Sequence, residues 1–289
     1  MSGFDGLRVL ALESRRAAEI AKLIGTYGGQ PTVAPSMREV PLESNKEALA
    51  FAAALLAGEF DVVIFLTGVG TRALLGVVET VHKRSEYVAA LQRVKVVARG
   101  PKPVAALREI GITPTITAPE PNTWHELLRA LDDAGKAAQE LDLQGARVAV
   151  QEYGVSNPEL LSGLRERGAQ VTRVPVYQWA LPLDLAPLRA AVAAIAEGAV
   201  DVALFTTAVQ AVHLFQVAAE MKLEEAVRNG LRRVVVASIG PTTSEELQRR
   251  GIRADLEPSH PKMGYLVKEA SEQAAELLRR KRQGTASAC

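Results

Sequence analysis

The chain is poor in cysteine, aromatic residues and net charge, and each shortage excludes a class of function. Its only cysteine is Cys289, so a disulfide framework, an iron–sulfur cluster, a thiolate zinc site and a buried catalytic cysteine are all excluded. Aromatic residues make up 4% of the 289 residues, which argues against stacking of bases or sugars on exposed rings. The formal net charge of +1 provides no broad field that would attract nucleic acid or an anionic membrane. An anionic ligand must therefore be bound by local groups.

The sequence also lacks a long hydrophobic run. The longest, Ala48–Ala57, is far shorter than the roughly 20 residues that a membrane span requires. Near the N-terminus, Asp5 and Glu13 interrupt the apolar residues, so no secretory signal is expected. Together with the single cysteine, these features predict a cytoplasmic protein that binds neither nucleic acid nor a membrane.

Metal and nucleophile motifs are missing as well. The four histidines, His82, His125, His213 and His260, have no spacing typical of metal ligands, so no metal site is expected. The sequence contains no Gly-x-Ser-x-Gly turn and no Gly-x-x-x-x-Gly-Lys-Ser/Thr loop. Serine hydrolysis and nucleoside triphosphate hydrolysis therefore have no support.

What the sequence does contain is an internal repeat. Asp61–Thr67 recurs as Asp201–Thr207, a shift of 140 residues that continues without a gap as far as Pro121. Nearer the start, Arg8 aligns with Arg147 at a shift of 139. The chain is therefore interpreted as two copies of one unit.

Each copy alternates short β-branched runs with longer helical stretches, which indicates βαβ units and a parallel sheet. The expected elements include one helix from about Thr71, one helix from about Val209, a strand at Arg253–Leu256 and a final helix at Gly264–Arg280. The sequence thus predicts an α/β fold with two similar doubly wound, flavodoxin-like parallel-sheet domains. The basic run Arg279–Arg282 is interpreted as a solvated helix end.

Two proline-bracketed segments, residues 35–41 and 175–182, follow the second expected strand of each copy and are candidate crossings between domains. If both segments cross, each domain combines the first strand–helix–strand of one copy with the remainder of the other copy. Two simple halves are the alternative, and the pattern of residues alone does not distinguish them.

One motif resembles a nucleotide-binding fingerprint. Thr67–Ala73 follows an expected strand, opens a helix and satisfies the Gly-x-Gly-x-x-Gly/Ala pattern. That fingerprint belongs on the first strand, with an acidic residue closing the next, whereas the next strand here ends at Arg99 and Gly100. The repeat counterpart Thr207–Gln210 has neither glycine. Nucleotide binding is therefore not expected.

Six loops lie where a strand ends and a helix begins, and small or hydroxylic residues dominate them. Such loops gather at the carboxyl edge of a doubly wound sheet, where exposed backbone N–H groups at helix N-termini attract carboxylates or phosphates. Ordinary helix caps are the alternative for any single loop. Six loops in two copies favour a polyanionic ligand held between domains. The candidate binding residues in and beside these loops are Ser14, Arg15, Thr67, Gly68, Arg99, Gly100, Gly154, Val155, Ser156, Thr206, Thr207, Ala208, Gly240, Thr242 and Thr243.

Tyr177 lies in the second proline-bracketed segment. A phenol there can reach an interdomain cleft as a hydrogen-bond donor, and the alternative is a partly buried aromatic residue with its hydroxyl group in water.

Four segments together resemble the uroporphyrinogen-III synthase family, through their order, spacing and duplication. They are Leu66–Leu74, Ala98–Leu107, Val174–Tyr177 and Ser238–Leu247. The resemblance implies two α/β domains joined by a two-stranded connector, with the exchange described above. One domain would then contain residues 1–37 and 179–280 and the other residues 42–175, with crossings at 35–41 and 175–182 and a flexible tail at 281–289. It also implies an active site in the cleft between the domains, with no metal and no organic cofactor.

The implied reaction belongs to heme biosynthesis. Hydroxymethylbilane, a linear tetrapyrrole with eight carboxylates, would lose its terminal hydroxyl group as water and cyclise with inversion of ring D. Tyr177 matches the family's cleft tyrosine and would hydrogen-bond the departing hydroxyl group, and Thr243 matches the threonine of the family's Gly-x-x-Thr turn. The first copy has Pro103 in place of that threonine. The expected partner is this small molecule, bound by a monomer, and the alternative is a non-catalytic regulatory module that binds a tetrapyrrole or another polyanion.

Overall fold

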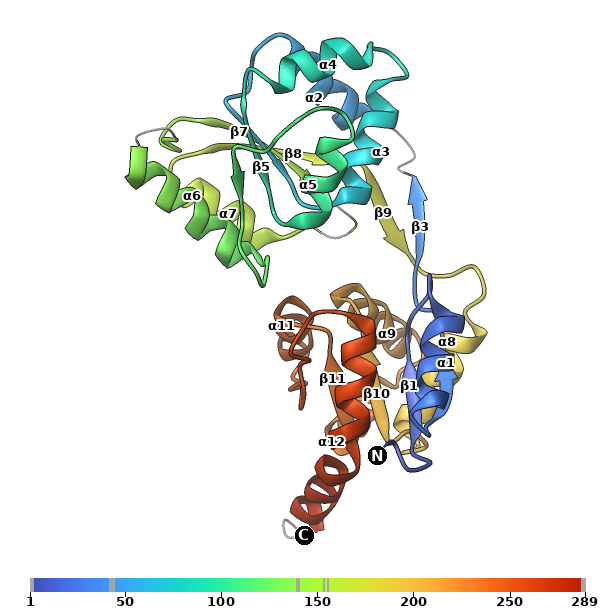
Figure 1. The fold of residues 1–289 in the computed structure, drawn as a ribbon. Helices are drawn as coiled ribbons and strands as arrows, with labels where there is room; N and C mark the ends of the chain where they lie inside the picture. Colours follow the sequence, from blue (N-terminus) through green and yellow to red (C-terminus); the bar gives the residue numbers. More distant parts are fainter. Residues whose placement is uncertain (1–2, 42–44, 139–140, 153, 155, 287–289) are drawn as a thin grey trace. The chain divides into compact units, whose positions relative to one another are not determined.

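The computed structural model describes residues 3–41, 45–138, 141–152, 154 and 156–286. The chain forms two compact units (Figure 1). Unit 1 contains Met1–Arg38 and Ala180–Cys289, and unit 2 contains Glu39–Trp179.

Unit 1 is built on a parallel sheet with the strand order β11-β10-β1-β2. Its elements are β1 (Arg8–Ala11), α1 (Ala17–Thr26), β2 (Gln30–Val33), α8 (Ala186–Ala196), β10 (Val202–Phe205), α9 (Ala208–Glu220), α10 (Glu224–Arg233), β11 (Val235–Ser238), α11 (Pro241–Arg249) and α12 (Met263–Ala286). Successive side chains of a strand point to opposite faces, so Val9 and Ala11 pack beneath α1 and α12 while Leu10 and Leu12 pack against the helices of the other face. Both faces of this sheet are therefore buried.

Unit 2 has the same construction, with the strand order β6-β5-β4-β7-β8. Its elements are α2 (Lys46–Leu56), β4 (Val62–Phe65), α3 (Gly68–Val78), α4 (Arg84–Leu91), β5 (Lys95–Ala98), α5 (Pro101–Arg108), β6 (Ile116–Thr117), α6 (Trp124–Ala138), β7 (Arg147–Glu152), α7 (Pro158–Glu166) and β8 (Gln170–Pro175). Val63 and Phe65 face α2 to α5, and Val62 and Ile64 face α6 and α7. A separate two-stranded sheet pairs β3 (Arg38–Pro41) with β9 (Tyr177–Ala180).

The two copies of the sequence repeat are exchanged between the sheets. In unit 1, β1 and β2 of the first copy stand beside β10 and β11 of the second, with Val9 paired to Val202. In unit 2, β7 and β8 of the second copy stand beside β4 to β6 of the first, with Val62 paired to Val148. Numbered in chain order within its own unit, the sheet of unit 1 has the order 2-1-3-4 and that of unit 2 has the order 3-2-1-4-5. The second order becomes the flavodoxin-like order 2-1-3-4-5 when the strands of unit 2 are counted from β7. The α/β fold with doubly wound, flavodoxin-like parallel sheets and a two-stranded connector is confirmed.

Several expected elements are wrong in detail. The helices expected from Thr71 and Val209 are each two helices, α3 with α4 and α9 with α10. The strand expected at Arg253–Leu256 is reduced to a single parallel bridge between Ala237 and Leu256. The expected tail begins too early, because α12 continues to Ala286 through basic residues that are good helix formers. Residues 287–289 of that tail lie outside the described residues. Within the described part of the chain, no helix is long and apolar enough to cross a membrane.

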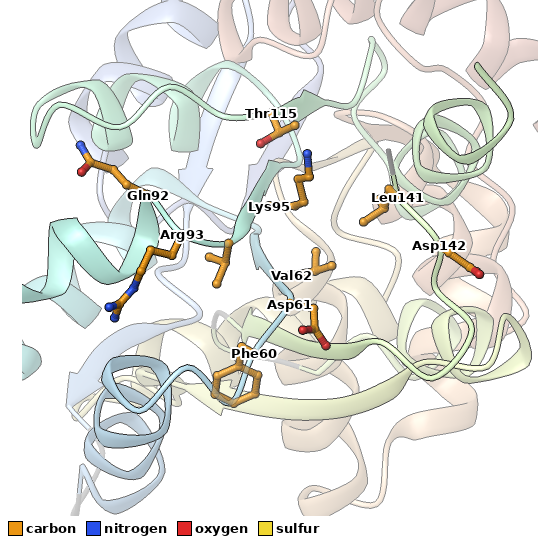
Figure 2. Close-up of a pocket in the computed structure, with 10 residues that line it drawn as sticks. Phe60, Asp61, Val62, Gln92, Arg93, Lys95, Thr115, Leu141 and Asp142 are labelled. Atoms are coloured by element: carbon orange, nitrogen blue, oxygen red, sulfur yellow. The ribbon is translucent and has the colours of Figure 1, made fainter. Parts of the chain in front are cut away.

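The amino edge of the unit 2 sheet carries a pocket of about 480 Å³ (Figure 2). Its lining comes from the residues just before β4, β5, β6 and β7, including Asp61, Val94, Lys95, Thr115 and Asp142. This edge is opposite to the one where ligands bind in doubly wound sheets.

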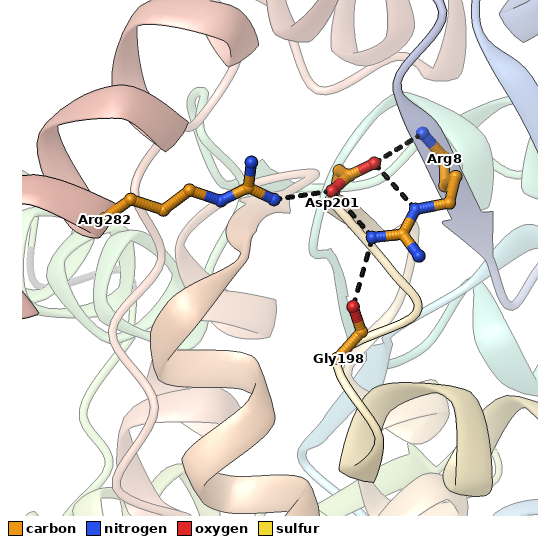
Figure 3. A network of polar contacts seen from close by, with 4 residues as sticks. All are labelled: Arg8, Gly198, Asp201 and Arg282. Carbon is orange, nitrogen blue, oxygen red and sulfur yellow. Dashed lines mark hydrogen bonds and ion pairs between the residues drawn. The ribbon is translucent and has the colours of Figure 1, made fainter.

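At the amino edge of unit 1, an ion pair joins the two copies of the repeat (Figure 3). The guanidinium of Arg8 contacts both carboxylate oxygens of Asp201, at 2.9 and 3.0 Å, and the Arg8 backbone N–H donates to the same carboxylate. Arg282 of α12 adds a contact to Asp201 at 2.8 Å. Unit 2 repeats the pair with Arg147 and Asp61, at 2.8 and 3.0 Å. The basic run at the end of α12 is thus not simply solvated, because Arg282 helps to bind Asp201.

Candidate substrate site

The backbone amides just ahead of α1 are already occupied by a carboxylate of this chain. The Oε1 atom of buried Glu13 accepts hydrogen bonds from the backbone N–H groups of Arg15 and Arg16, at 3.0 and 3.2 Å. The Ser14 hydroxyl oxygen likewise accepts two backbone N–H groups of the chain, those of residues 36 and 37. Because Glu13 accepts the amides of Arg15 and Arg16, the anion site expected at Ser14 and Arg15 is filled from within.

Thr206, beside α1, is fully engaged in hydrogen bonds. Its hydroxyl group donates to Glu13 Oε2 at 2.5 Å and accepts from Gln210 Nε2 at 2.8 Å, while its backbone N–H donates to Gln210 Oε1 at 2.7 Å. A hydroxyl group has one hydrogen, so Thr206 cannot donate it to a substrate carboxylate in this state. The next residue, Thr207, is the N-cap of α9 and makes no side-chain capping bond within the described residues. The amides that begin at Ala208 are therefore uncapped.

The amino end of α11 is likewise uncapped. Its N-cap, Gly240, has no side chain to cap the helix, and the Gly240 N–H group contacts the Ser238 hydroxyl oxygen at 3.2 Å. Thr242 is exposed, whereas Thr243 is 3% exposed. Of the two α11 threonines that were expected to bind a ligand, Thr242 is thus the accessible one.

In unit 2, the two glycines of the nucleotide-like motif are required by packing. A Cβ atom on Gly68 would lie 2.5 Å from the carbonyl oxygen of Lys102, and one on Gly70 would lie 2.1 Å from Gln151 Nε2. Thr67 is an ordinary N-cap, because its hydroxyl oxygen accepts the Gly70 N–H at 3.0 Å. These contacts account for the motif without a bound nucleotide.

Gln151 is the unit 2 counterpart of a position at which unit 1 has an apolar residue. The shift of 139 relates it to Leu12, and the shift of 140 relates Gly70 to Gln210. Each unit therefore has one glutamine at this pair of positions. In unit 2 it is Gln151 of β7, and in unit 1 it is Gln210 of α9. Gln151 is fully buried and its Nε2 donates to the Glu152 carbonyl at 2.6 Å, but its Oε1 has no hydrogen-bond partner among the described residues.

The amino end of α5 is uncapped, like that of its repeat counterpart α11. Its N-cap is Gly100, which makes no side-chain capping bond within the described residues. Gly100 is buried and Arg99 is half-buried. A Cβ atom on Gly100 would lie 2.7 Å from Asn122 Oδ1, so glycine is required here for close packing.

The last residue of β7 is a second buried carboxylate. Glu152 is 4% exposed, and it accepts hydrogen bonds from Ser156 Oγ at 2.6 Å and from Arg173 Nε at 2.8 Å. Gly154 has a φ of +73°, and a Cβ atom there would lie 2.0 Å from Trp179 Cδ1. The third residue expected to bind ligand in the loop after β7, Val155, lies outside the described residues.

Tyr177 belongs to the hydrophobic core of unit 2. Its side chain is 4% exposed, and its ring packs edge to face against Trp179 with the centroids 5.7 Å apart. The expectation of a partly buried linker residue with its hydroxyl group in water is wrong, because β9 places the ring beneath Trp179. A role in the reaction would require access to this buried group.

The six expected loops thus divide into two kinds. In three loops side-chain oxygens accept the backbone amides: Glu13 accepts those of Arg15 and Arg16 just ahead of α1, and Thr67 and Asn157 cap α3 and α7, the last through Oδ1 at 2.8 Å from the Leu160 N–H. The first amides of α5, α9 and α11 have no side-chain cap among the described residues. Three helix N-termini therefore remain able to bind an anion through backbone N–H groups.

Sequence reasoning missed the two buried carboxylates. Glu13 and Glu152 are related by the shift of 139, and both are buried at the carboxyl edge of their sheets. The repeat itself held the signal, because an acidic residue closes the first strand of both copies. The contact between Glu13 and Thr206 was beyond its reach, since these residues are 193 positions apart.

Metal ligands are not grouped in the described part of the chain, where no cluster of three or more His, Cys, Asp or Glu side chains is found. His213 of α9 is buried, and its Nδ1 atom lies 2.7 Å from the Ser36 carbonyl oxygen. Burial lowers the pKa of His213, although the Ser36 carbonyl opposes that shift. The geometry therefore gives His213 a structural role as a neutral imidazole.

Comparison with known proteins agrees with the fold. The family model described as Uroporphyrinogen-III synthase HemD matches residues 18–268. The uncharacterized protein YjjA of Bacillus subtilis strain 168 is 30% identical over 271 residues, which cover 93% of this chain and 97% of YjjA.

Two crystal structures of uroporphyrinogen III synthase from the extremely thermophilic bacterium Thermus thermophilus are also similar. A mutant form has a TM-score of 0.72 at 24% identity, covering 94% of this chain and 100% of that one. The wild-type form has a TM-score of 0.58 at 26% identity, covering 94% and 99%. The chain belongs to the uroporphyrinogen-III synthase family, whose fold it shares, and is thus a synthase-like enzyme of the lyase class.

Proposed function

We propose that this protein is a uroporphyrinogen-III synthase that cyclises hydroxymethylbilane with inversion of ring D. The carbon–oxygen bond of the terminal hydroxymethyl group breaks, the hydroxyl group leaves as water, and the macrocycle closes through a spiro intermediate. The product is uroporphyrinogen III. The reaction needs one copy of the chain and no nucleic acid, membrane, metal or organic cofactor.

The observation that carries the proposal is the set of uncapped helix N-termini. The starts of α5, α9 and α11 lie at the carboxyl edges of the two sheets, and the net charge of the chain is only +1. An octacarboxylate bound to such a chain must be neutralised by local dipoles, and helix N-termini supply them. The binding residues that fit this role best are Gly100, Thr207, Ala208, Gly240 and Thr242.

The substrate itself explains why the edges carry so little catalytic apparatus. Hydroxymethylbilane closes spontaneously to the uninverted isomer, so the protein has to impose a conformation and assist the loss of hydroxide. We assign the assisting hydrogen bond to the hydroxyl group of Tyr177. Because that side chain is 4% exposed, its use requires a rearrangement that brings the hydroxyl group into contact with the substrate.

The direct test is an assay with hydroxymethylbilane in which isomers I and III are separated by chromatography. A synthase converts the substrate to isomer III faster than the spontaneous reaction forms isomer I. Isomer I alone, at the uncatalysed rate and with binding of the substrate retained, would contradict the proposal. It would favour a regulatory module that binds a tetrapyrrole, which fits the burial of Tyr177.

Replacement of Tyr177 by phenylalanine tests the role of its hydroxyl group. The expected result is a fall in turnover of roughly 100-fold or more, typical for loss of acid assistance, with nearly unchanged substrate affinity. Tyr87→Phe is the matched control, because Tyr87 lies in the same hydrophobic cluster, is 1% exposed, and has no partner for its hydroxyl group among the described residues. Equal turnover in the two variants would remove Tyr177 from the mechanism without affecting the proposed reaction.

A further inference from the structure

The pocket at the amino edge of unit 2 has a counterpart in unit 1 that is filled by side chains of this chain. The shift of 140 carries Asp61, Val94 and Thr115 of the pocket onto Asp201, Val234 and Asp255. The end of α12 contacts all three counterparts. The repeat therefore shows what kind of group this position of the fold accepts.

Two basic side chains occupy the position in unit 1. Lys281 Nζ lies 2.7 Å from the Val234 carbonyl oxygen and 2.5 Å from Asp255 Oδ2. Arg282 Nη2 lies 2.8 Å from Asp201 Oδ1 (Figure 3). The acceptors at this edge, two carboxylates and a backbone carbonyl, thus bind an ammonium and a guanidinium group.

In unit 2 the chain supplies no such cations at the matching positions. The same shift carries Lys281 and Arg282 onto Leu141 and Asp142, both of which line the pocket. The side chain of Asp61 is 47% exposed, whereas that of Asp201 is 9% exposed. Asp61 therefore keeps its ion pair with Arg147 and still offers its outer surface to a second cation, with Asp142 as a further carboxylate.

At two other lining positions the pocket is more positive than the matching positions of unit 1. Lys95 and Thr115 of unit 2 replace Val235 and Asp255 of unit 1. Figure 2 shows Lys95 and Thr115 toward one side of the pocket and Asp61 toward the other. The lining therefore offers the ammonium of Lys95 at one place and the carboxylates of Asp61 and Asp142 at others. The remaining cation of the lining, the guanidinium of Arg93, donates to the Leu56 carbonyl oxygen at 3.3 Å.

We propose that this pocket binds a small zwitterion whose cationic end contacts Asp61 and Asp142 and whose carboxylate contacts Lys95. A volume of about 480 Å³ is in the range of small-molecule sites. The ligand class is that of amino acids with separated charges, in which an ammonium or guanidinium group and a carboxylate are joined by a short apolar chain. The site is independent of the carboxyl edge to which the synthase reaction is assigned.

Calorimetric titration of the whole protein tests the proposal, with ω-amino acids from 4-aminobutyrate to 6-aminohexanoate as probes. Hexylamine and hexanoate, each with one charged end, are the matched ligands. At least one ω-amino acid should bind saturably and roughly tenfold or more tightly than either matched ligand, the factor expected for one charge-assisted contact. Absence of saturable binding, or equal binding of hexylamine, would overturn the proposal.

Three variants locate the binding. Asp142→Asn keeps the Oδ1 acceptor that caps the Gln144 N–H at 2.8 Å, and it should weaken the ω-amino acid roughly tenfold. Lys95→Met should weaken it similarly while leaving hexylamine unaffected. Thr115→Asp restores the carboxylate found at this position in unit 1, so it should make hexylamine the better ligand. Unchanged affinities in variants with wild-type circular dichroism would place the binding elsewhere and refute the site.

Discussion

The Arg8–Asp201 ion pair should stabilise unit 1 more than its repeat counterpart stabilises unit 2. Both pairs join the same two strand starts through the same bonds, but the side chain of Asp201 is 9% exposed and that of Asp61 is 47% exposed. The hydrogen bonds from Arg8 hold the pKa of Asp201 at about 2, against 3.8 normally. A shift of that size corresponds to about 2 kcal/mol of folding free energy.

Asp201→Asn is therefore expected to lower the free energy of unfolding of unit 1 by about 2 kcal/mol at pH 7. Asp61→Asn is the matched control. Hydrogen bonds from Arg147 also lower the pKa of Asp61, but water screens this exposed pair, so its removal should cost at most about 1 kcal/mol. Because the pKa of Asp201 is depressed in the folded state, its contribution is complete above pH 3.8 and is lost as the pH falls toward 2.

Urea unfolding, followed by fluorescence and by circular dichroism, measures the stabilities of the two units. Both tryptophans of the chain, Trp124 and Trp179, belong to unit 2, so their fluorescence reports that unit, whereas far-ultraviolet circular dichroism reports both. Asp201→Asn should shift the circular dichroism transition with little change in fluorescence. The difference in free energy of unfolding between Asp201→Asn and wild type should be constant from about pH 7 to 5 and shrink below about pH 4. Equal losses for Asp201→Asn and Asp61→Asn, or a difference that persists undiminished at low pH, would refute the reasoning.

Two further pairs of variants test the site's internal contacts. Gln210→Leu removes both hydrogen bonds to Thr206 and should destabilise the protein by about 1–3 kcal/mol. Gln151→Leu should cost less, because Gln151 Oε1 has no hydrogen-bond partner among the described residues. A larger loss of stability for Gln151→Leu in thermal unfolding would be inconsistent with this hydrogen bonding. Gly70→Ala would place a Cβ atom 2.1 Å from Gln151 and should destabilise the protein by about 1–3 kcal/mol. Gly76→Ala, on the exposed face of α3, meets nothing within 4 Å and should stabilise the protein by about 0.5–1 kcal/mol. Stabilisation by both substitutions would show that Gly70 is not required for packing.

Local sequence patterns were sufficient for the elements and for the layered α/β architecture. Strands such as Val62–Phe65 are continuous apolar runs, typical of strands buried on both faces, and each is followed by a glycine or threonine at a helix start. Patterns were not sufficient for α4 and α10, which follow α3 and α9 after short turns. An uninterrupted helical pattern does not reveal such a turn, because tertiary packing decides where the helix stops.

The loops of the candidate site could be located from the sequence, but the sequence did not show which of them are occupied by side chains of this chain. Their place at strand ends follows from the parallel fold alone. Whether the space at a helix start is free depends on distant side chains, as at Gly70, where Gln151 fills the space. The burial of Tyr177 is likewise set by packing against Trp179.

The sequence by itself determined that the protein is a duplicated α/β chain, because residue type and spacing survive at a shift of about 140 positions. It also determined that an anionic ligand must be bound by local groups, since net charge is a property of composition. Only the tertiary structure decided that β1 pairs with β10 and β4 with β7, which exchanges the copies between sheets. It also decided which helix N-termini are free and which pocket lacks its basic side chains. Pairing, capping and ion pairing join residues far apart in the chain, so they depend on which surfaces pack together rather than on local pattern.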